Sequence, residues 1–208
     1  ECRNAGIVPV MITGDHPATA LAIARRLEIA DTSDAMLTGK DLDQLDDVSL
    51  QGKAAHVRVY ARVDPAQKIR IVKALQARGE CIAMTGDGVN DAPALNRADI
   101  GIAMGKNGTD VAREAADMVL TDDNFTSIVS AVRLGRRIFD NLKKAMAYIL
   151  SIHVPIAGLS LVRVLLNLPL VMLPVQVVFL ELVIDPACSV VFESEKEELD
   201  VMDRPPRR

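Results

Sequence analysis

The chain has 208 residues, of which 50% are hydrophobic and 25% are charged, and its formal net charge is −4. Such high hydrophobicity with so little net charge excludes an intrinsically disordered chain. The mild acidity, the lack of Trp and the presence of only two Tyr and four Phe argue against a nucleic-acid surface, which needs clustered basic residues and aromatic stacking platforms.

Short apolar runs alternate with helical patterns in the first part of the chain. The first run predicts a strand over 7–13, and a helix follows over 18–27. Residues 31–53 are polar and lack a clear period, so we expect a surface segment with one short helix near 39–45. The remaining pattern predicts strands over 57–63, 81–85, 100–104 and 118–120, with helices over 65–77, shortly after Pro93 and over 110–116. Continuously apolar strands alternating with helices predict an α/β fold with a parallel sheet, whose sites lie at the carboxyl ends of the strands.

The segment between Lys144 and Phe192 has a different composition. Its only fully charged residues are Arg163, Glu181 and Asp185. Two apolar runs, 145–166 and 173–192, are each near the ~20 residues that span a bilayer, and Asn167-Leu168-Pro169 separates them. We therefore predict a transmembrane helical hairpin, joined to the α/β part by a helical pattern that starts at Phe125.

Basic residues crowd both outer flanks of this hairpin, and its turn has none. The positive-inside rule then places both flanks and the α/β part in the cytoplasm. The basic residues are Arg133, Arg136, Arg137, Lys143 and Lys144 before the hairpin, and Lys196 and the arginines of 204–208 after it.

The ends and the cysteines of the chain also carry information. The chain begins at Glu1 in mid-pattern without an initiator Met or a signal segment, so we expect it to be part of a longer protein. Cys2, Cys81 and Cys188 are odd in number and far apart, which is typical of reduced thiols in a cytosolic or membrane setting.

Two turns of sequence Thr-Gly-Asp follow predicted strands, at 13–15 and at 85–87. In the second, Asp87 and Asp91 stand four residues apart at a strand-to-helix turn, and glycines beside Asp87 allow a close backbone approach. Carboxylates next to helix N-terminal amides suit Mg²⁺ and a phosphoryl group. Taken singly, each turn is more typical of helix capping or of a simple Asp-Gly turn than of a phosphoryl site.

Lys68 lies near the start of the helix between these two turns. A hydroxyl group, an ammonium group and a carboxylate pair at one edge of a sheet suit phosphoryl transfer, which needs positioning and charge stabilisation. Lys68 alone is more often a solvated helix residue.

The hairpin carries ionisable residues at membrane depth, where they are costly and mark functional sites. Glu181 and Asp185 are four residues apart on one helix face, and Pro186 interrupts the backbone hydrogen bonding beside them. This combination suits a hard-cation site, although pairing with a neighbouring helix for structure alone is the alternative. His153 is either a ligand or proton acceptor, or a hydrogen-bonded packing residue. Arg163 reaches the outer interface or pairs with an acidic residue.

Several motifs make the chain resemble the P-type cation-transporting ATPases, nearest to the calcium-pump-like group, over essentially its whole length. The matching motifs are MITGD at 11–15, ARVDP at 61–65, the uninterrupted MTGDGVNDAPAL at 84–95 and DDNF at 122–125. The second apolar run and the following segment to Arg207 also match. The resemblance implies a partial haloacid-dehalogenase-like Rossmannoid sheet followed by an α-helical transmembrane hairpin.

What the resemblance implies for catalysis is an aspartyl-phosphate site with ATP as substrate and Mg²⁺ as cofactor. Its phosphorylation-site residues would be Thr13, Gly14, Asp15, Lys68, Asn90 and Asp91, with Asp87 as the Mg²⁺ ligand. The family's nucleophile, an Asp in Asp-Lys-Thr-Gly-Thr, does not occur in this sequence. In the family it lies upstream, so we expect that this chain cannot form the aspartyl-phosphate by itself.

The resemblance also implies a domain organisation. Residues 1–125 would form the carboxyl-terminal half of a cytoplasmic phosphorylation domain and 126–144 a stalk helix. Residues 145–192 would be the fifth and sixth transmembrane helices, and 193–208 a cytoplasmic loop. The partners would be the transported cation, the upstream part of the same chain and the lipid bilayer, with no nucleic acid.

In the hairpin, the resemblance assigns cation binding to Glu181 and Asp185, with His153 as a further candidate. Glu181 replaces an Asn ligand, His153 stands where a calcium pump has a ligand Asn, and Ile156 where it has a ligand Glu. We therefore expect one cation site, in an ATP-driven pump for a divalent cation such as Ca²⁺. The alternatives are a membrane-tethered phosphatase of the same superfamily and a non-catalytic regulatory fragment.

Overall fold

The computed structural model describes residues 2–30, 35–167, 169 and 173–206. The chain divides into two compact units. The α/β unit contains Cys2 and Gly6–Ile128, and the hairpin unit contains Arg3–Ala5 and the chain from Val129 onward.

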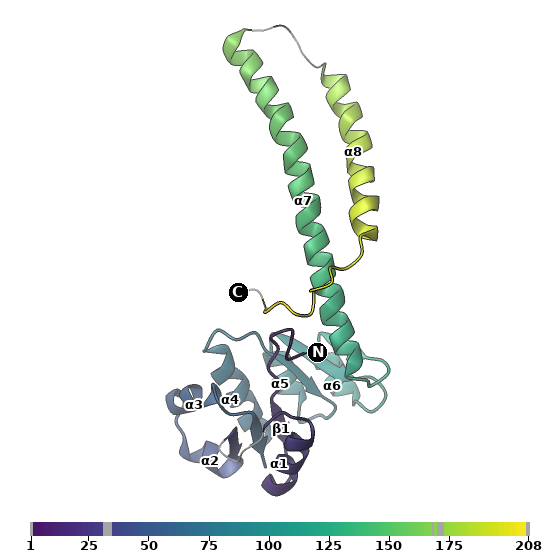
Figure 1. Ribbon diagram of the computed structural model, residues 1–208. Helices are drawn as coiled ribbons and strands as arrows, with labels where there is room; N and C mark the ends of the chain where they lie inside the picture. The colour runs from purple at the N-terminus through teal and green to yellow at the C-terminus, as the bar shows by residue number, and fades with distance from the viewer. Residues whose placement is uncertain (1, 31–34, 168, 170–172, 207–208) are drawn as a thin grey trace. The chain divides into compact units, whose positions relative to one another are not determined.

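The α/β unit contains two parallel three-stranded sheets (Figure 1). The first has the order β1-β3-β2, with β1 at Met11–Thr13, β3 at Val59–Ala61 and β2 at Met36–Thr38. The second has the order β4-β5-β6, with β4 at Ala83–Gly86, β5 at Ile100–Met104 and β6 at Met118–Leu120. The predicted parallel α/β architecture is confirmed, but the strands form two sheets instead of one.

At least one helix lies between each strand and the next along the chain, as parallel pairing requires. Their bounds are α1 at Pro17–Arg26, α2 at Gly39–Gln44, α3 at Asp47–Ala54, α4 at Pro65–Gln76, α5 at Ala92–Arg97 and α6 at Asp110–Ala115. Proline stands in the first turn of α1, α4 and α5, where its missing N–H costs nothing.

The polar segment 35–53 is mostly exposed, as expected, and the short helix expected near 39–45 is α2. It also forms β2 and α3, which were not expected, and Leu42 and Leu50 are each only 1% exposed. These elements were missed because polar residues here are helix caps. The side chains of Thr38 and Asp46 accept hydrogen bonds from backbone N–H groups at the starts of α2 and α3. The part of the expectation that concerns 31–34 lies outside the described residues.

The helix α4 links the two sheets. Ile71 and Ala74 belong to the core cluster of the first sheet, and Val72 belongs to the cluster of the second. Ile12 of β1 packs against both clusters. The N-terminal turn of α4, which carries Lys68, is therefore held by a core common to both sheets.

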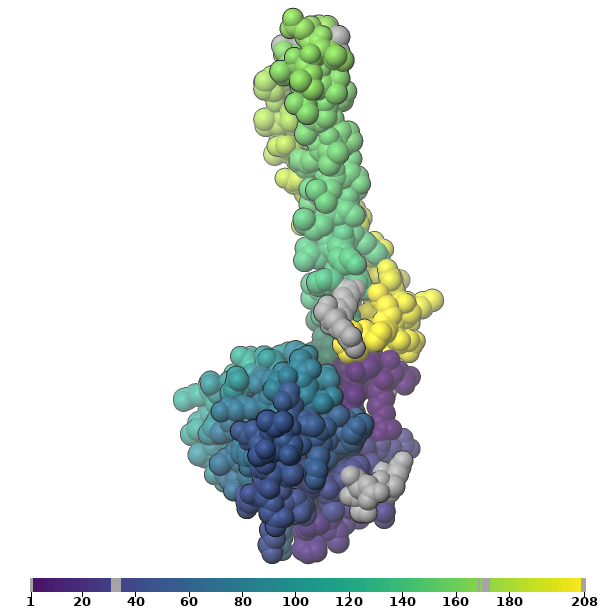
Figure 2. Space-filling view, turned by 90° about the vertical axis from the view of Figure 1, so that its left-hand side faces the viewer, coloured from purple at the N-terminus to yellow at the C-terminus, as the bar shows by residue number. Residues whose placement is uncertain are grey.

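The hairpin unit contains two long helices, α7 at Thr126–Leu166 and α8 at Pro174–Ser194, which lie side by side (Figures 1 and 2). Both are long and apolar enough to cross a membrane, and their most apolar windows are 0% and 6% buried. As predicted, α7 runs without interruption from just after Phe125 into the first apolar segment. Of the predicted turn between the helices, Leu168 lies outside the described residues.

The segment after α8 folds back onto the base of α7. In Figure 2 it is the yellow segment beside the green helix. The Arg136 guanidinium donates to the backbone carbonyls of Val201, Arg204 and Ala5 at 2.9, 2.7 and 2.7 Å, and the Arg204 guanidinium lies 2.8 Å from the buried Asp140 carboxylate.

Candidate functional site

The first Thr-Gly-Asp turn follows β1 directly. Its residues do not cap α1, because the N-cap is His16, whose Nδ1 accepts from the backbone N–H of Ala18 at 3.3 Å. Instead, the Thr13 hydroxyl oxygen accepts from the backbone N–H of Asp15 at 3.1 Å. The hydroxyl proton of Thr13 therefore stays available for a ligand.

The second turn, between β4 and α5, places Asp91 at the N-cap position of α5 without a side-chain capping bond. Its carboxylate instead accepts from Lys68 Nζ at 2.5 Å, and the Lys68 and Asp91 side chains are only 17% and 12% exposed. The Asp91 side chain therefore does not cap α5, and Lys68 is not a solvated surface residue.

Close packing at this turn requires glycine at position 86. A Cβ atom on Gly86 would lie 2.6 Å from Cβ of Asp91, far below normal contact. The Asp87 carbonyl accepts from the backbone N–H of Thr109 at 2.8 Å, which fixes the backbone, while the side chains of Asp87 and Asn90 stay exposed. The turn thus buries one carboxylate against Lys68 and presents the other to solvent.

Hydrogen bonds connect the two turns through the start of α4. The backbone N–H groups of Arg62 and Val63 donate to the carbonyls of Asp15 and Thr13 at 3.1 and 3.2 Å. The helix begins just after these residues, and one turn later Lys68 reaches Asp91. We call the edge formed by residues 13–15, 68 and 85–91 the β1/β4 edge.

The β1/β4 edge lies at the free borders of both sheets. β1 pairs only with β3 and β4 only with β5 among the described residues. Thr85 and Ala83 of β4 are exposed, although strands in the middle of a covered parallel sheet are normally buried.

The β1/β4 edge offers one carboxylate that is suited to bind Mg²⁺. Among the described residues, no group of three His, Cys, Asp or Glu side chains is placed to hold a metal ion. Mg²⁺ usually binds through one or two carboxylates together with water and substrate phosphate. The exposed Asp87 carboxylate fits this role, whereas Asp91 is already engaged by Lys68.

In the hairpin unit, two of the three predicted cation-site residues lie close together. His153 Nε2 of α7 is 3.8 Å from Glu181 Oε1 of α8, and His153 Nδ1 is 2.9 Å from the carbonyl of Ile149. Asp185 lies one turn after Glu181 on α8 and is exposed. Arg163 forms no ion pair with any described residue. Sequence spacing could not reveal the His153–Glu181 approach, because the two residues belong to different helices.

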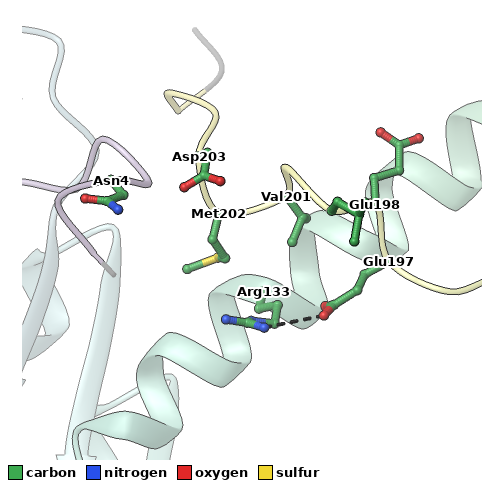
Figure 3. A pocket seen from close by; sticks show the side chains of 8 residues that line it. Asn4, Arg133, Glu197, Glu198, Val201, Met202 and Asp203 are labelled. Carbon is green, nitrogen blue, oxygen red and sulfur yellow. Dashed lines mark hydrogen bonds and ion pairs between the residues drawn. The ribbon is translucent and has the colours of Figure 1, made fainter.

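A shallow depression of about 430 Å³ lies where the segment after α8 meets α7. Figure 3 shows Arg133 and Glu197 lining it, joined by an ion pair of 3.4 Å. None of the candidate residues lines this depression, so we assign it no role.

Family models match both parts of the chain. Residues 1–99 and 68–132 match two models described as haloacid dehalogenase-like hydrolase. Residues 169–208 match the model described as Cation transporting ATPase, C-terminus.

Curated relatives match along the whole chain. The calcium-transporting ATPase lmo0841 of Listeria monocytogenes is 50% identical over 207 residues, which are 100% of this chain and 23% of that protein. The calcium-transporting ATPase of Bacillus subtilis is 47% identical over 100% of this chain and 23% of its own length. The chain therefore spans about a quarter of the length of the curated relatives it matches.

A solved structure supports the same relation. A zinc-transporting PIB-type ATPase in its E2.Pi state matches 88% of this chain and 24% of its own, with 30% identity and a TM-score of 0.57. Together with the family models, this similarity confirms the predicted haloacid-dehalogenase-like α/β fold.

Proposed function

The chain belongs to the P-type cation-transporting ATPases, and from that membership we propose that it supplies part of the phosphorylation domain and one transmembrane hairpin of an ATP-driven pump. Residues 1–125 contribute the carboxyl-terminal half of the phosphorylation domain, 126–144 the stalk, 145–192 the membrane hairpin and 193–208 a cytoplasmic loop. The cargo is a divalent cation, and the relatives are named as transporters of Ca²⁺.

The observation that carries the proposal is the Lys68–Asp91 pair at the β1/β4 edge. A buried carboxylate holds one donor of the Lys68 ammonium in place, and an ammonium group has three donors, so the others stay free for a phosphoryl oxygen. The Thr13 hydroxyl adds a further donor, because its oxygen already accepts from the backbone N–H of Asp15. Preorganised donors of this kind stabilise the charge that develops on a transferring phosphoryl group.

The other residues of the edge complete this role. Gly14 has open space around its Cα, so the backbone can approach a phosphoryl group closely. Asp15 orients Thr13 through its backbone N–H. Asn90 is exposed in the same turn as Asp87, so its amide is available to a ligand. Mg²⁺ held by Asp87 would neutralise charge on the phosphoryl oxygens.

The nucleophile of this reaction belongs to a segment outside the chain. A parallel strand between the free borders of β1 and β4 would join the two sheets into one and bring an Asp carboxylate to the edge. That carboxylate would attack the γ-phosphorus of ATP with loss of ADP, and water would later release inorganic phosphate. The chain alone is therefore expected to be inactive.

The hairpin supplies the membrane part of the pump. Lys and Arg on both flanks support a cytoplasmic location for the two ends of the hairpin and for the α/β unit. Glu181 and Asp185 bind the cargo at membrane depth, where carboxylates are costly unless they serve such a site.

The test is phosphoenzyme formation in membranes that contain the full-length pump, with labelled ATP and a panel of cations. We expect an acid-stable phosphoenzyme that depends on one class of divalent cation. Lys68→Met should abolish its normal formation and turnover, whereas Lys73→Met, an exposed lysine of the same helix, should leave both unchanged.

The membrane site is tested in the same assay with Glu181→Gln and Asp185→Asn. Both variants should raise the cation concentration needed for phosphorylation. If turnover persists without any cation and both variants behave as the wild type, the protein is a membrane-tethered phosphatase. If no phosphoenzyme forms under any condition, the pump proposal is wrong.

A further inference from the structure

The imidazole of His153 is held in one orientation. Its Nδ1 lies 2.9 Å from the backbone carbonyl of Ile149, one turn earlier on α7. A carbonyl can only accept, so Nδ1 carries the proton of the neutral ring and donates it there. In that tautomer Nε2 has a free lone pair.

The free nitrogen faces a carboxylate of the other helix. Nε2 of His153 is 3.8 Å from Oε1 of Glu181, which is too long for a hydrogen bond. Two ligands about 2.1 Å from one ion lie roughly 3.0–3.4 Å apart, so a small side-chain rotation would let both atoms bind a single cation. Both side chains are less than half exposed on one side of the hairpin, at 41% and 47%.

The α8 surface around Glu181 is the side turned to α7. Cys188 is the buried residue of α8, and Val177 and Ile184 are half-buried, whereas Glu181 and its neighbours in sequence are exposed. Residues 177, 181, 184 and 188 follow helical spacing along one face. Asp185 borders this face and is exposed, but among the described residues it does not form a three-membered metal-holding group with His153 and Glu181, so the inference rests on His153 and Glu181.

A proline in each helix leaves one backbone carbonyl near His153 or Glu181 without its helical hydrogen bond, so its oxygen can bind a cation. Pro155 has no N–H to donate to the carbonyl of Ser151, and Pro186 none for the carbonyl of Leu182. Each freed carbonyl lies within one turn of His153 or Glu181.

From this geometry we infer that His153 determines specificity and that the site prefers a divalent first-row transition metal, such as Zn²⁺ or Ni²⁺, over Ca²⁺. Ca²⁺ binds oxygen ligands, whereas imidazole suits Zn²⁺, Ni²⁺, Fe²⁺ and Cu²⁺. A metal-binding histidine almost always donates its second ring N–H to a carbonyl or carboxylate, which is the contact that Ile149 provides. The inference rests on the proposed pump function, because it names the cargo of that same membrane site.

The first experiment measures cation-dependent phosphorylation of the full-length pump. Zn²⁺, Ni²⁺ and Ca²⁺ are titrated at buffered free concentrations, with Mg²⁺ in constant excess so that the nucleotide site stays occupied. The wild type should respond to Zn²⁺ or Ni²⁺ at a concentration at least about tenfold lower than Ca²⁺, since weaker perturbations of a metal site already cost 10- to 100-fold in affinity.

His153→Asn exchanges the ring nitrogen for an amide oxygen. It should raise the half-activating transition-metal concentration about tenfold or more and change that of Ca²⁺ by much less. His56→Asn, the same exchange at an exposed position of the α/β unit, is the control and should change neither. His153→Gln replaces His153→Asn if the latter is not inserted into membranes.

A second readout does not depend on turnover. Equilibrium dialysis of Zn²⁺ against purified full-length pump measures binding directly, and His153→Asn should weaken it. A wild type that prefers Ca²⁺, or equal cation preference in the wild type and His153→Asn, would overturn the inference and leave the pump intact. Absence of phosphoenzyme with every cation would overturn the pump proposal, and Zn²⁺ binding would still decide whether His153 is a ligand.

Discussion

Tyr60 is the largest fully buried side chain of the α/β unit, and its hydroxyl has no hydrogen-bond partner among the described residues. An unsatisfied buried hydroxyl costs about 1–3 kcal/mol. Tyr60→Phe removes the hydroxyl and keeps the ring, so we expect the free energy of unfolding to rise by about 1 kcal/mol. Thermal unfolding of the protein in detergent measures this, and a lower midpoint would contradict it.

Because the Tyr60 hydroxyl is buried, the free energy of unfolding should depend on pH in the alkaline range. Desolvation raises the pKa of Tyr60 from its usual 10.0 to about 12, because burial disfavours the phenolate. A raised folded-state pKa favours the protonated form, so its contribution is complete below pH 10 and is lost as pH rises toward about 12. Tyr60→Phe should flatten the stability profile in that range.

Asp123 holds the loop after β5 through its carboxylate. It accepts from the backbone N–H groups of Gly105, Lys106 and Asn107 at 2.6, 3.0 and 2.8 Å. These bonds, first that of Lys106, lower the pKa of Asp123. Asp123→Asn keeps a residue type that tolerates the positive φ of 55° at this position but weakens the three bonds, so the unfolding midpoint should fall.

The loss of stability caused by Asp123→Asn should depend on pH. A carboxylate whose pKa is lowered by folding stabilises the folded state fully when the pH is above its pKa in the unfolded chain, about 3.9. This stabilisation is lost as the pH falls through the pKa of the folded state. The difference between the wild type and Asp123→Asn should therefore be largest near neutral pH and shrink in acid. An equal difference at pH 7 and at pH 3 would show that the carboxylate charge is not involved.

At the scale of elements, α4 begins with a reciprocal cap that positions Lys68. The Asp64 carboxylate accepts from the backbone N–H of Gln67 at 2.7 Å, and the Gln67 side chain accepts from that of Asp64 at 3.1 Å. Asp64→Ala should lower the free energy of unfolding by about 1 kcal/mol and slow phosphorylation of the full pump by loosening Lys68. Asp64→Asn retains a capping side chain, so near-wild-type stability is expected; a loss equal to that of Asp64→Ala would exclude capping as the cause.

The strands and helices differ in how well the sequence predicts them. The strands at 100–104 and 118–120 match the predictions because apolar runs bounded by turn residues need no distant information. The strand β2 and helix α3 were missed. Their hydrophobic positions, such as Leu50, are sparse, and the polar residues around them act as caps, which composition does not distinguish from a loop.

At the scale of the whole molecule, α7 is one continuous helix from Thr126 to Leu166. We propose that it couples phosphorylation to the membrane site, because coupling needs an element that both sites can bias. Two glycines inserted beside Gly135 would rotate the following residues by about 200° and weaken the helix by about 1 kcal/mol each. We expect phosphoenzyme to form in this full-length variant while transport is abolished.

Gly135→Ala is the matched control for that insertion. A Cβ atom at this position would meet nothing within 4 Å, and alanine favours the helix, so transport should be unchanged. Transport that survives the double insertion would show that α7 does not carry the coupling.

The sequence by itself determined the composition boundary at the hairpin, the alternation of strands and helices, and the candidate residues of both sites, because these follow from local periodicity and motif. Only the tertiary structure decided what each residue contacts. Lys68 and Asp91 are 23 residues apart, and the local sequence around Asp91 favoured a helix cap, which the pair with Lys68 replaces. The approach of His153 to Glu181 likewise depends on how α7 and α8 pack. Contacts between side chains of separate elements depend on how those elements pack, so local spacing in the sequence does not predict them.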